Sequence, residues 1–103
     1  MSKRILGIDP GTNVLGYGVL QVNGNHAEVV VMGVIEFKDL HDPYSKLQRI
    51  YEKTSNIIKT YKPDELAIEA PFFGKNIQSM LKLGRAQGVC IAAATMHNLT
   101  VNE

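Results

Sequence analysis

The sequence predicts an α/β fold in which helices pack on one mixed, five-stranded sheet. Its first third contains three extended segments separated by short turns, which is typical of an antiparallel meander. The remainder alternates helical with short apolar segments, and connections of helical length join parallel strands. The expected order is three strands, a helix, a strand, a helix and a final strand, in a single domain over residues 1–103.

The composition is ordinary for a globular domain. Of the 103 residues, 45% are hydrophobic and 20% are charged, and the formal net charge is +1. These values exclude a collagen-like or disordered chain, and the small net charge argues against binding polyanions by overall charge alone. No apolar stretch approaches the ~20 residues that cross a bilayer. Because Cys90 is the only cysteine, we expect no internal disulfide and a reducing, cytoplasmic location.

Turn-forming residues delimit the three strands of the meander. The first strand ends at Asp9, and residues 10–13 read Pro-Gly-Thr-Asn, a turn in which glycine can supply a positive φ. Asn23 and Gly24 form a dipeptide typical of tight hairpin turns, so the second and third strands are expected to be antiparallel. The expected strands are Arg4–Ile8, Val14–Val22 and Ala27–Phe37.

The apolar spacing changes from strand-like to helical after Asp42. This residue is expected to cap a helix that begins at Pro43, and Pro63 is expected to follow its end. The apolar stripe of this helix consists of Leu47, Ile50, Tyr51, Thr54, Ile57, Ile58 and Tyr61. Beyond it we expect a strand over Leu66–Ile68 that ends at Glu69, a loop over residues 70–76, a helix over Ile77–His97 and a strand over Leu99–Asn102.

Two carboxylates, Asp9 and Glu69, each end an apolar strand and precede a loop that contains proline and glycine. If the two strands are neighbours, both side chains lie where α/β sheets bind ligands, outside the carboxyl ends of the strands. Two converging carboxylates repel each other unless a cation lies between them, and oxygen ligands suit Mg²⁺ or Mn²⁺. The alternative is that Asp9 only shapes a turn and Glu69 is only solvated.

Three blocks of sequence resemble the family of RuvC-type Holliday junction resolvases. They are Ile5–Asn13 with Gly16-Tyr17-Gly18, then Ala67–Glu69 with Phe72–Asn76, then Leu81–Gly88. The resemblance implies a ribonuclease H-like fold and a homodimeric, Mg²⁺-dependent endonuclease that cuts four-way DNA junctions symmetrically in recombination and repair. It also implies that Asp9 and Glu69 are catalytic metal ligands, and that a branch-migration helicase is a partner.

The family pattern continues beyond this chain. Its members carry a last helix with one or two further acidic ligands, whereas Glu103 fits no motif of the family. We therefore expect a C-terminally truncated domain that holds Mg²⁺ weakly, because the ion otherwise keeps most of its water shell. The 103-residue chain is expected to be feeble or inactive by itself.

Candidate DNA-binding residues surround the two carboxylates in the sequence. One of two adjacent aromatic residues is expected to stack on an unpaired base, and the family pattern favours Phe72 over Phe73, while the other fills the core. Residues at the start of the second helix are expected to bind phosphates. The full set is Thr12, Phe72, Phe73, Lys75, Asn76 and Arg85. The alternatives are a turn-shaping role for Thr12 and a solvated helix face for Arg85.

Small residues recur on one face of the second helix. Gly84 and Gly88 are four residues apart and would let another backbone come close. That backbone belongs either to the sheet of the same chain or to a second copy related by a two-fold axis. The expected dimer interface consists of Met80, Leu81, Gly84, Gly88 and Ile91.

Two other functions remain compatible with the same residues. The run from Asp9 to Thr12 also resembles the phosphate loop of actin-like and sugar-kinase-type proteins, in which loop amides hold nucleotide phosphates. The other is a module that binds junctions without cutting them. The length of the chain and its Phe-Phe-Gly-Lys-Asn loop favour the nuclease.

Overall fold

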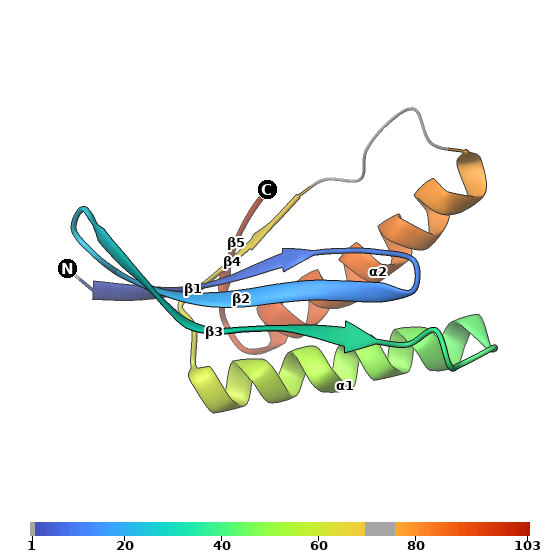
Figure 1. Cartoon of the computed structure of the whole chain (residues 1–103), viewed down its shortest axis with the longest axis horizontal. Helices are drawn as coiled ribbons and strands as arrows, with labels where there is room; N and C mark the ends of the chain where they lie inside the picture. The colour runs from blue at the N-terminus through green and yellow to red at the C-terminus, as the bar shows by residue number, and fades with distance from the viewer. Residues whose placement is uncertain (1, 70–75) are drawn as a thin grey trace.

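The computed structural model describes residues 2–69 and 76–103. It contains a five-stranded sheet and two helices in the expected order (Figure 1). Each element boundary agrees with its expected position to within two residues. The elements are β1 (Ser2–Asp9), β2 (Val14–Asn23), β3 (His26–Glu36), α1 (Pro43–Tyr61), β4 (Glu65–Ile68), α2 (Ile77–Met96) and β5 (Thr100–Asn102).

The sheet has the order β3-β2-β1-β4-β5, so β1 is its central strand. The meander of β1, β2 and β3 is antiparallel, whereas β4 runs parallel to β1 and β5 parallel to β4. The change from hairpin neighbour to crossover neighbour therefore falls at β1. This is the point at which the sequence predicts a ligand site.

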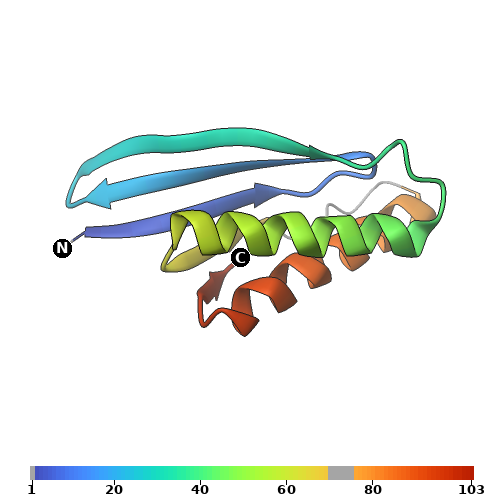
Figure 2. The ribbon, with the colours of Figure 1, turned by 90° about the horizontal axis from the view of Figure 1, so that it is seen from below.

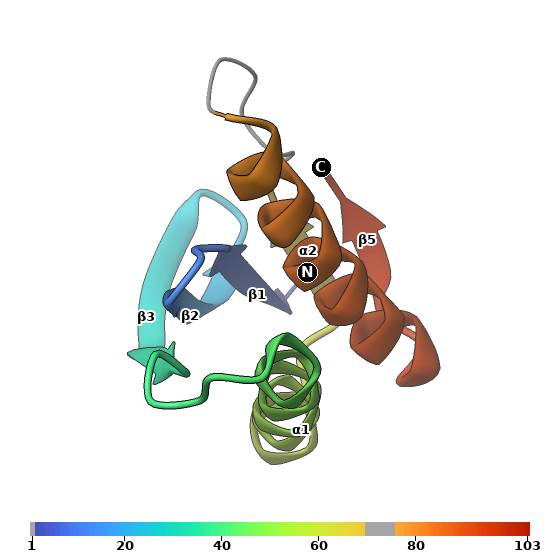
Figure 3. The ribbon, with the colours of Figure 1, turned by 90° about the vertical axis from the view of Figure 1, so that its right-hand side faces the viewer.

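Both helices pack on the same side of the sheet, as Figures 2 and 3 show. Alternate residues of the strands, such as Leu6 and Leu66, are fully buried against them, together with Ile50 of α1 and Cys90 of α2. These residues form one hydrophobic cluster. Within the described ranges, neither helix is long and apolar enough to cross a membrane.

The opposite side of the sheet is open among the described residues. Side chains of β2 and β3 that alternate with the buried ones are solvent-exposed, including Val14, Met32 and Val34, with Met32 at 74%. Strand residues alternate between faces, so each strand offers one set of side chains to the core and one to this open face.

The β2–β3 hairpin turns one residue later than the Asn-Gly dipeptide suggests. Asn23 pairs with His26, so the two turn residues are Gly24 and Asn25. Only Gly24 has a positive φ, of 60°. A positive φ at the first turn residue alone is the type II′ arrangement, which requires glycine there.

Helix α1 has the expected cap at its start. The Asp42 carboxylate accepts hydrogen bonds from the backbone N–H and the hydroxyl of Ser45, at 2.9 and 2.8 Å. The helix ends at Tyr61, where Lys62 takes a left-handed conformation with φ 50°. Its stripe faces the core, although Tyr51, included in the expected stripe, is 39% exposed.

Cys90 is fully buried, and its sulfur lies 4.0 Å from the hydroxyl of Thr54. Burial raises the pKa of the Cys90 thiol from 9.0 to about 11, because an apolar environment disfavours the thiolate.

This rise of two pKa units lowers the thiolate fraction of Cys90 near pH 8 by about 100-fold, and the thiolate is the reactive form. Alkylation of the native protein by iodoacetamide, followed by mass spectrometry, should be at least about 100-fold slower than in denaturant. Equal rates would contradict this burial.

Candidate metal and nucleic-acid site

The pairing of β1 with β4 brings Asp9 and Glu69 to the same rim. Ile8 lies opposite Ile68 in the parallel register, so the next residue of each chain segment is one of the carboxylates. Ile8 and Ile68 are buried against the helices. The alternation of a strand therefore places both acidic side chains on the open face, where both are exposed.

Asp9 and Glu69 line one groove on the open face, which we call the acidic groove. Its floor contains several glycines, and Gly16 lies directly opposite Asp9 in β2. Asn102 and Glu103, at the end of β5, line the same groove. Because glycine adds no side chain, the carboxylates remain accessible to a bulky ligand.

The donor atoms of the acidic groove fit a hard cation. The lining supplies carboxylate, amide and phenol oxygens, with no histidine or cysteine, and such ligands suit Mg²⁺ or Mn²⁺. Among residues 2–69 and 76–103 there is no cluster of three or more His, Cys, Asp or Glu side chains placed to hold a metal. The carboxylates that line the groove are Asp9, Glu69 and Glu103, and a cation held by two of them would retain water.

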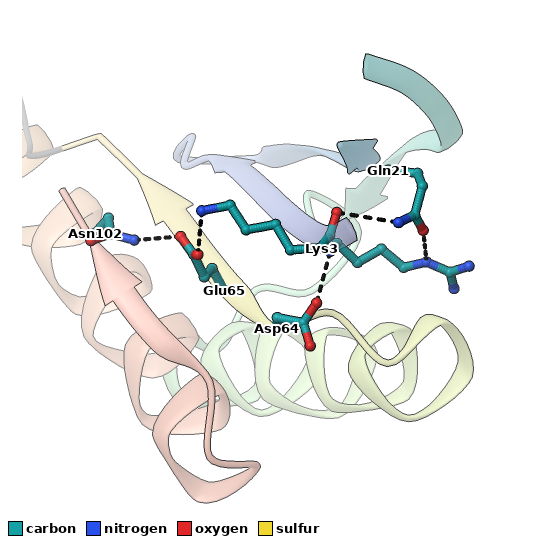
Figure 4. Close-up of polar contacts among 6 residues, drawn as sticks. Lys3, Gln21, Asp64, Glu65 and Asn102 are labelled. Atoms are coloured by element: carbon teal, nitrogen blue, oxygen red, sulfur yellow. Dashed lines mark hydrogen bonds and ion pairs between the residues drawn. The ribbon is translucent and has the colours of Figure 1, made fainter. Parts of the chain in front are cut away.

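Polar contacts near the starts of β1 and β4 and at the end of β5 support the register that creates this site (Figure 4). The Glu65 carboxylate accepts a hydrogen bond from Lys3 Nζ at 2.7 Å and another from Asn102 Nδ2 at 2.9 Å. Glu65 thus links β1, β4 and β5 on the open face. The backbone N–H of Arg4 also donates to the Asp64 carboxylate, at 2.8 Å.

The loop after Asp9 requires glycine at position 11. A Cβ added to Gly11 would collide with the carbonyl oxygen of Val14, and no flexible group is there to move. The chain therefore turns tightly between Asp9 and β2. This holds Thr12 close to the rim that carries the carboxylates.

Gln87 is a residue of the site that the sequence analysis missed. It projects from α2, is 8% exposed, and its Nε2 donates to the backbone carbonyl of Glu69 at 3.2 Å. The same amide group lies 3.5 Å from the Glu103 carboxylate. A glutamine between Ala86 and Cys90 on the buried helix face was the available signal, because buried polar groups need partners.

The expected DNA-binding residues fall into three groups. Thr12 and Arg85 line a second groove together, beside the start of α1. The Asn76 side chain accepts a hydrogen bond from the backbone N–H of Ser79 at 2.8 Å and so caps α2. The other three expected residues, Phe72, Phe73 and Lys75, lie outside the described residues.

Four of the five expected dimer residues lie on α2 outside the positions that pack on the core, whereas Ile91 packs against the hydrophobic cluster. Leu81 is 53% exposed, Gly88 is exposed, and Met80, Gly84 and Ile91 are half-buried. A Cβ added at Gly84 or at Gly88 would meet no described atom within 4 Å. Close packing of these glycines on the sheet of the same chain is therefore excluded among the described residues.

Comparison with known proteins assigns the family. The sequence model described as crossover junction endodeoxyribonuclease RuvC matches residues 5–103. The chain belongs to the RuvC family. The RuvC of Bacteroides fragilis is 57% identical over 101 residues, or 98% of this chain and 54% of that protein. The RuvC of Cytophaga hutchinsonii is 54% identical over 103 residues, or 100% of this chain and 52% of that protein.

A solved RuvC structure confirms the ribonuclease H-like fold. It is that of T. thermophilus RuvC in complex with a Holliday junction substrate, with a TM-score of 0.88 and 27% identity. The match covers 96% of this chain and 61% of that one. The chain spans about half the length of the curated relatives it matches. Family membership argues against the actin-like interpretation.

The contact between Gln87 and Glu69 predicts the effect of one isosteric substitution. Gln87→Glu replaces the donor with a carboxylate that faces a carbonyl oxygen and the Glu103 carboxylate. The free energy of unfolding should fall by about 2 kcal/mol, since a buried acceptor loses its partner. Urea denaturation measures this. The matched control, Gln48→Glu on the exposed side of α1, should change stability by less than about 0.5 kcal/mol, and equal effects would contradict the role of Gln87.

Proposed function

We propose that the protein is a structure-selective endonuclease that resolves four-way (Holliday) DNA junctions in recombination and repair. The observation that carries this proposal is the meeting of Asp9 and Glu69 on one accessible rim, in a chain of the RuvC family. The junction DNA in the T. thermophilus RuvC structure supports the substrate. A DNA substrate, and a single cysteine that can form no internal disulfide, agree with a cytoplasmic location.

In this proposal Asp9 and Glu69, at the ends of two paired strands, would hold Mg²⁺ or Mn²⁺. When bound, the ion supplies Lewis-acid activation of water and of the scissile phosphodiester. The chain contributes rigid positioning: β1 and β4 fix the two carboxylates, and Gln87 holds the backbone at Glu69. Preorganised ligands of this kind need no rearrangement during the reaction.

The proposal also assigns DNA contacts to residues around the rim that carries Asp9 and Glu69. Thr12, Lys75, Asn76 and Arg85 bind the phosphate backbone, and one of Phe72 and Phe73, with Phe72 favoured by the family pattern, stacks on an unpaired base. Symmetric cutting of two strands requires two active sites, so the protein acts as a homodimer. A branch-migration helicase is the partner that the family resemblance implies.

Removing either carboxylate tests the proposed metal site independently of cleavage. Mn²⁺ should bind this chain weakly, on the order of millimolar, because two carboxylates leave the ion mostly hydrated. Asp9→Asn or Glu69→Gln should weaken that binding by on the order of tenfold or more, since ligand charge sets affinity. Electron paramagnetic resonance of free Mn²⁺ measures both.

Cleavage of a synthetic four-way junction is measured with the same variants. Any Mg²⁺-dependent cutting should disappear in Asp9→Asn and on addition of EDTA. Glu52→Gln, on the exposed side of α1, is the matched control and should behave as the unchanged chain. Mn²⁺ binding that is identical in all four proteins would refute the metal site.

The dimer surface on α2 is tested by a substitution that the monomer tolerates. Gly88→Glu places a charged side chain in space that is open in the single chain. It should abolish self-association, measured by analytical ultracentrifugation, while thermal stability stays equal or rises, because glycine disfavours a helix interior by about 1 kcal/mol. Asn56→Glu on α1 should leave the sedimentation unchanged. Unaltered association of Gly88→Glu would place the interface elsewhere.

A further inference from the structure

A second groove lies at the end of the molecule where the β1–β2 loop, the start of α1 and the first half of α2 come together, at the right of Figure 1. Its polar rim comprises Thr12, His41, Lys46, Lys82 and Arg85. We call it the basic groove. Three of these five side chains carry a permanent positive charge at neutral pH, although the chain as a whole has a net charge of only +1.

The two lysines of the basic groove form no ion pair with the described acidic residues near it. Asp39 pairs with Arg49 at 2.7 Å. Asp42 accepts hydrogen bonds from Ser45 as the cap of α1. Lys46 and Lys82 form no ion pair with any residue in ranges 2–69 and 76–103. An anionic ligand would therefore meet two lysines that no described carboxylate pairs with.

The floor of the basic groove is apolar. Phe37, Ile50 and Ala86, which line it, are each less than 4% exposed. A cationic rim over an apolar floor matches a strand of nucleic acid, in which charged phosphates alternate with less polar sugars. The larger groove between β3 and α1 is a poorer match, because Glu36 lines it and its Arg49 is already paired, which leaves Lys53 as the one unpaired cation of its described lining.

The basic groove lies across the β1–β2 loop from the rim that carries Asp9. Gly11 and Thr12, which line it, follow Asp9 by two and three residues. A phosphodiester chain that passes the acidic groove can therefore continue over Thr12 into the basic groove. The two grooves would bind different parts of one DNA strand. The carboxylates of the acidic groove suit a cation bound at one phosphate, and the lysines of the basic groove suit the neighbouring phosphates that have no bound cation.

We propose that the basic groove binds the phosphodiester backbone of the substrate DNA beside the cut site, through Lys46 and Lys82. This inference rests on the proposed nuclease function and adds α1 to its DNA-binding surface. The contact is made to the backbone, so it is independent of base sequence. His41 and Arg85 border the same path.

Salt-dependent DNA binding tests this assignment. The double variant Lys46→Gln/Lys82→Gln keeps most of each side-chain stem and removes two charges. Binding of this chain to a synthetic four-way junction is measured by fluorescence anisotropy in EDTA between about 50 and 200 mM salt. The slope of log affinity against log salt should decrease in magnitude by about two, with affinity lower by on the order of tenfold per lysine.

The matched control is Lys53→Gln/Lys59→Gln, two exposed lysines elsewhere on α1 with the same change of net charge. It should retain the slope of the unchanged chain. If both double variants lose DNA affinity equally, the loss comes from the change in net charge alone, and the assignment of DNA binding to the basic groove is wrong. A loss of ATP binding in Lys46→Gln/Lys82→Gln with junction binding intact would assign the groove to a free nucleotide and also overturn it.

The outcomes separate this inference from the function on which it rests. If the unchanged chain binds no junction DNA, the proposed function is contradicted. The proposed role of the basic groove is then contradicted as well. The other outcome is that junction binding and Mn²⁺ binding at Asp9 and Glu69 are intact, but the salt dependence of DNA binding is unaltered in Lys46→Gln/Lys82→Gln. In that case only the proposed role of the basic groove is contradicted.

Discussion

Parallel pairing of β1 with β4 is the constraint on which the candidate site depends. The register from Ile5–Glu65 to Ile8–Ile68 sets Asp9 beside Glu69 and points both to the open face. A shift of one residue would turn every side chain of β4 over, burying Glu69 and exposing Leu66 and Ile68. Burial of these leucine and isoleucine side chains, together with the Lys3–Glu65–Asn102 contacts, therefore fixes the position of two carboxylates that make no contact with the core.

The charges of the site are arranged by the layers of the fold. The acidic groove lies on the open face of the sheet, and the basic groove lies at the strand ends beside the helices. The tight loop that requires Gly11 separates them. Carboxylates next to lysines would neutralise one another and bind neither a cation nor a phosphate well. Separation by one loop lets both kinds of ligand be held along one DNA strand.

The elements could be predicted because their signals are local, as with the Asp42 cap, the turn residues after Asp9 and the Pro63 stop. The meeting of Asp9 and Glu69 was also foreseeable, since it follows from strand order. Two features could not be predicted from the sequence. They are the contact of Gln87 with the Glu69 carbonyl and the presence of Lys46 and Lys82 in one groove. Both contacts depend on how α1 and α2 pack on the sheet. The apolar pattern of one helix does not determine the angle or the register at which it packs against another element.

The glycines of α2 give a physical argument about what approaches this helix. A glycine in a helix interior costs about 1 kcal/mol relative to alanine, and α2 contains two of them. Neither Gly84 nor Gly88 is required by the packing of the described residues, because a Cβ at either position would meet only open space. The cost is therefore not offset by packing among those residues. Close approach of a second backbone to this face would offset it, and exposed Leu81 beside the glycines supplies the apolar surface that such a contact buries.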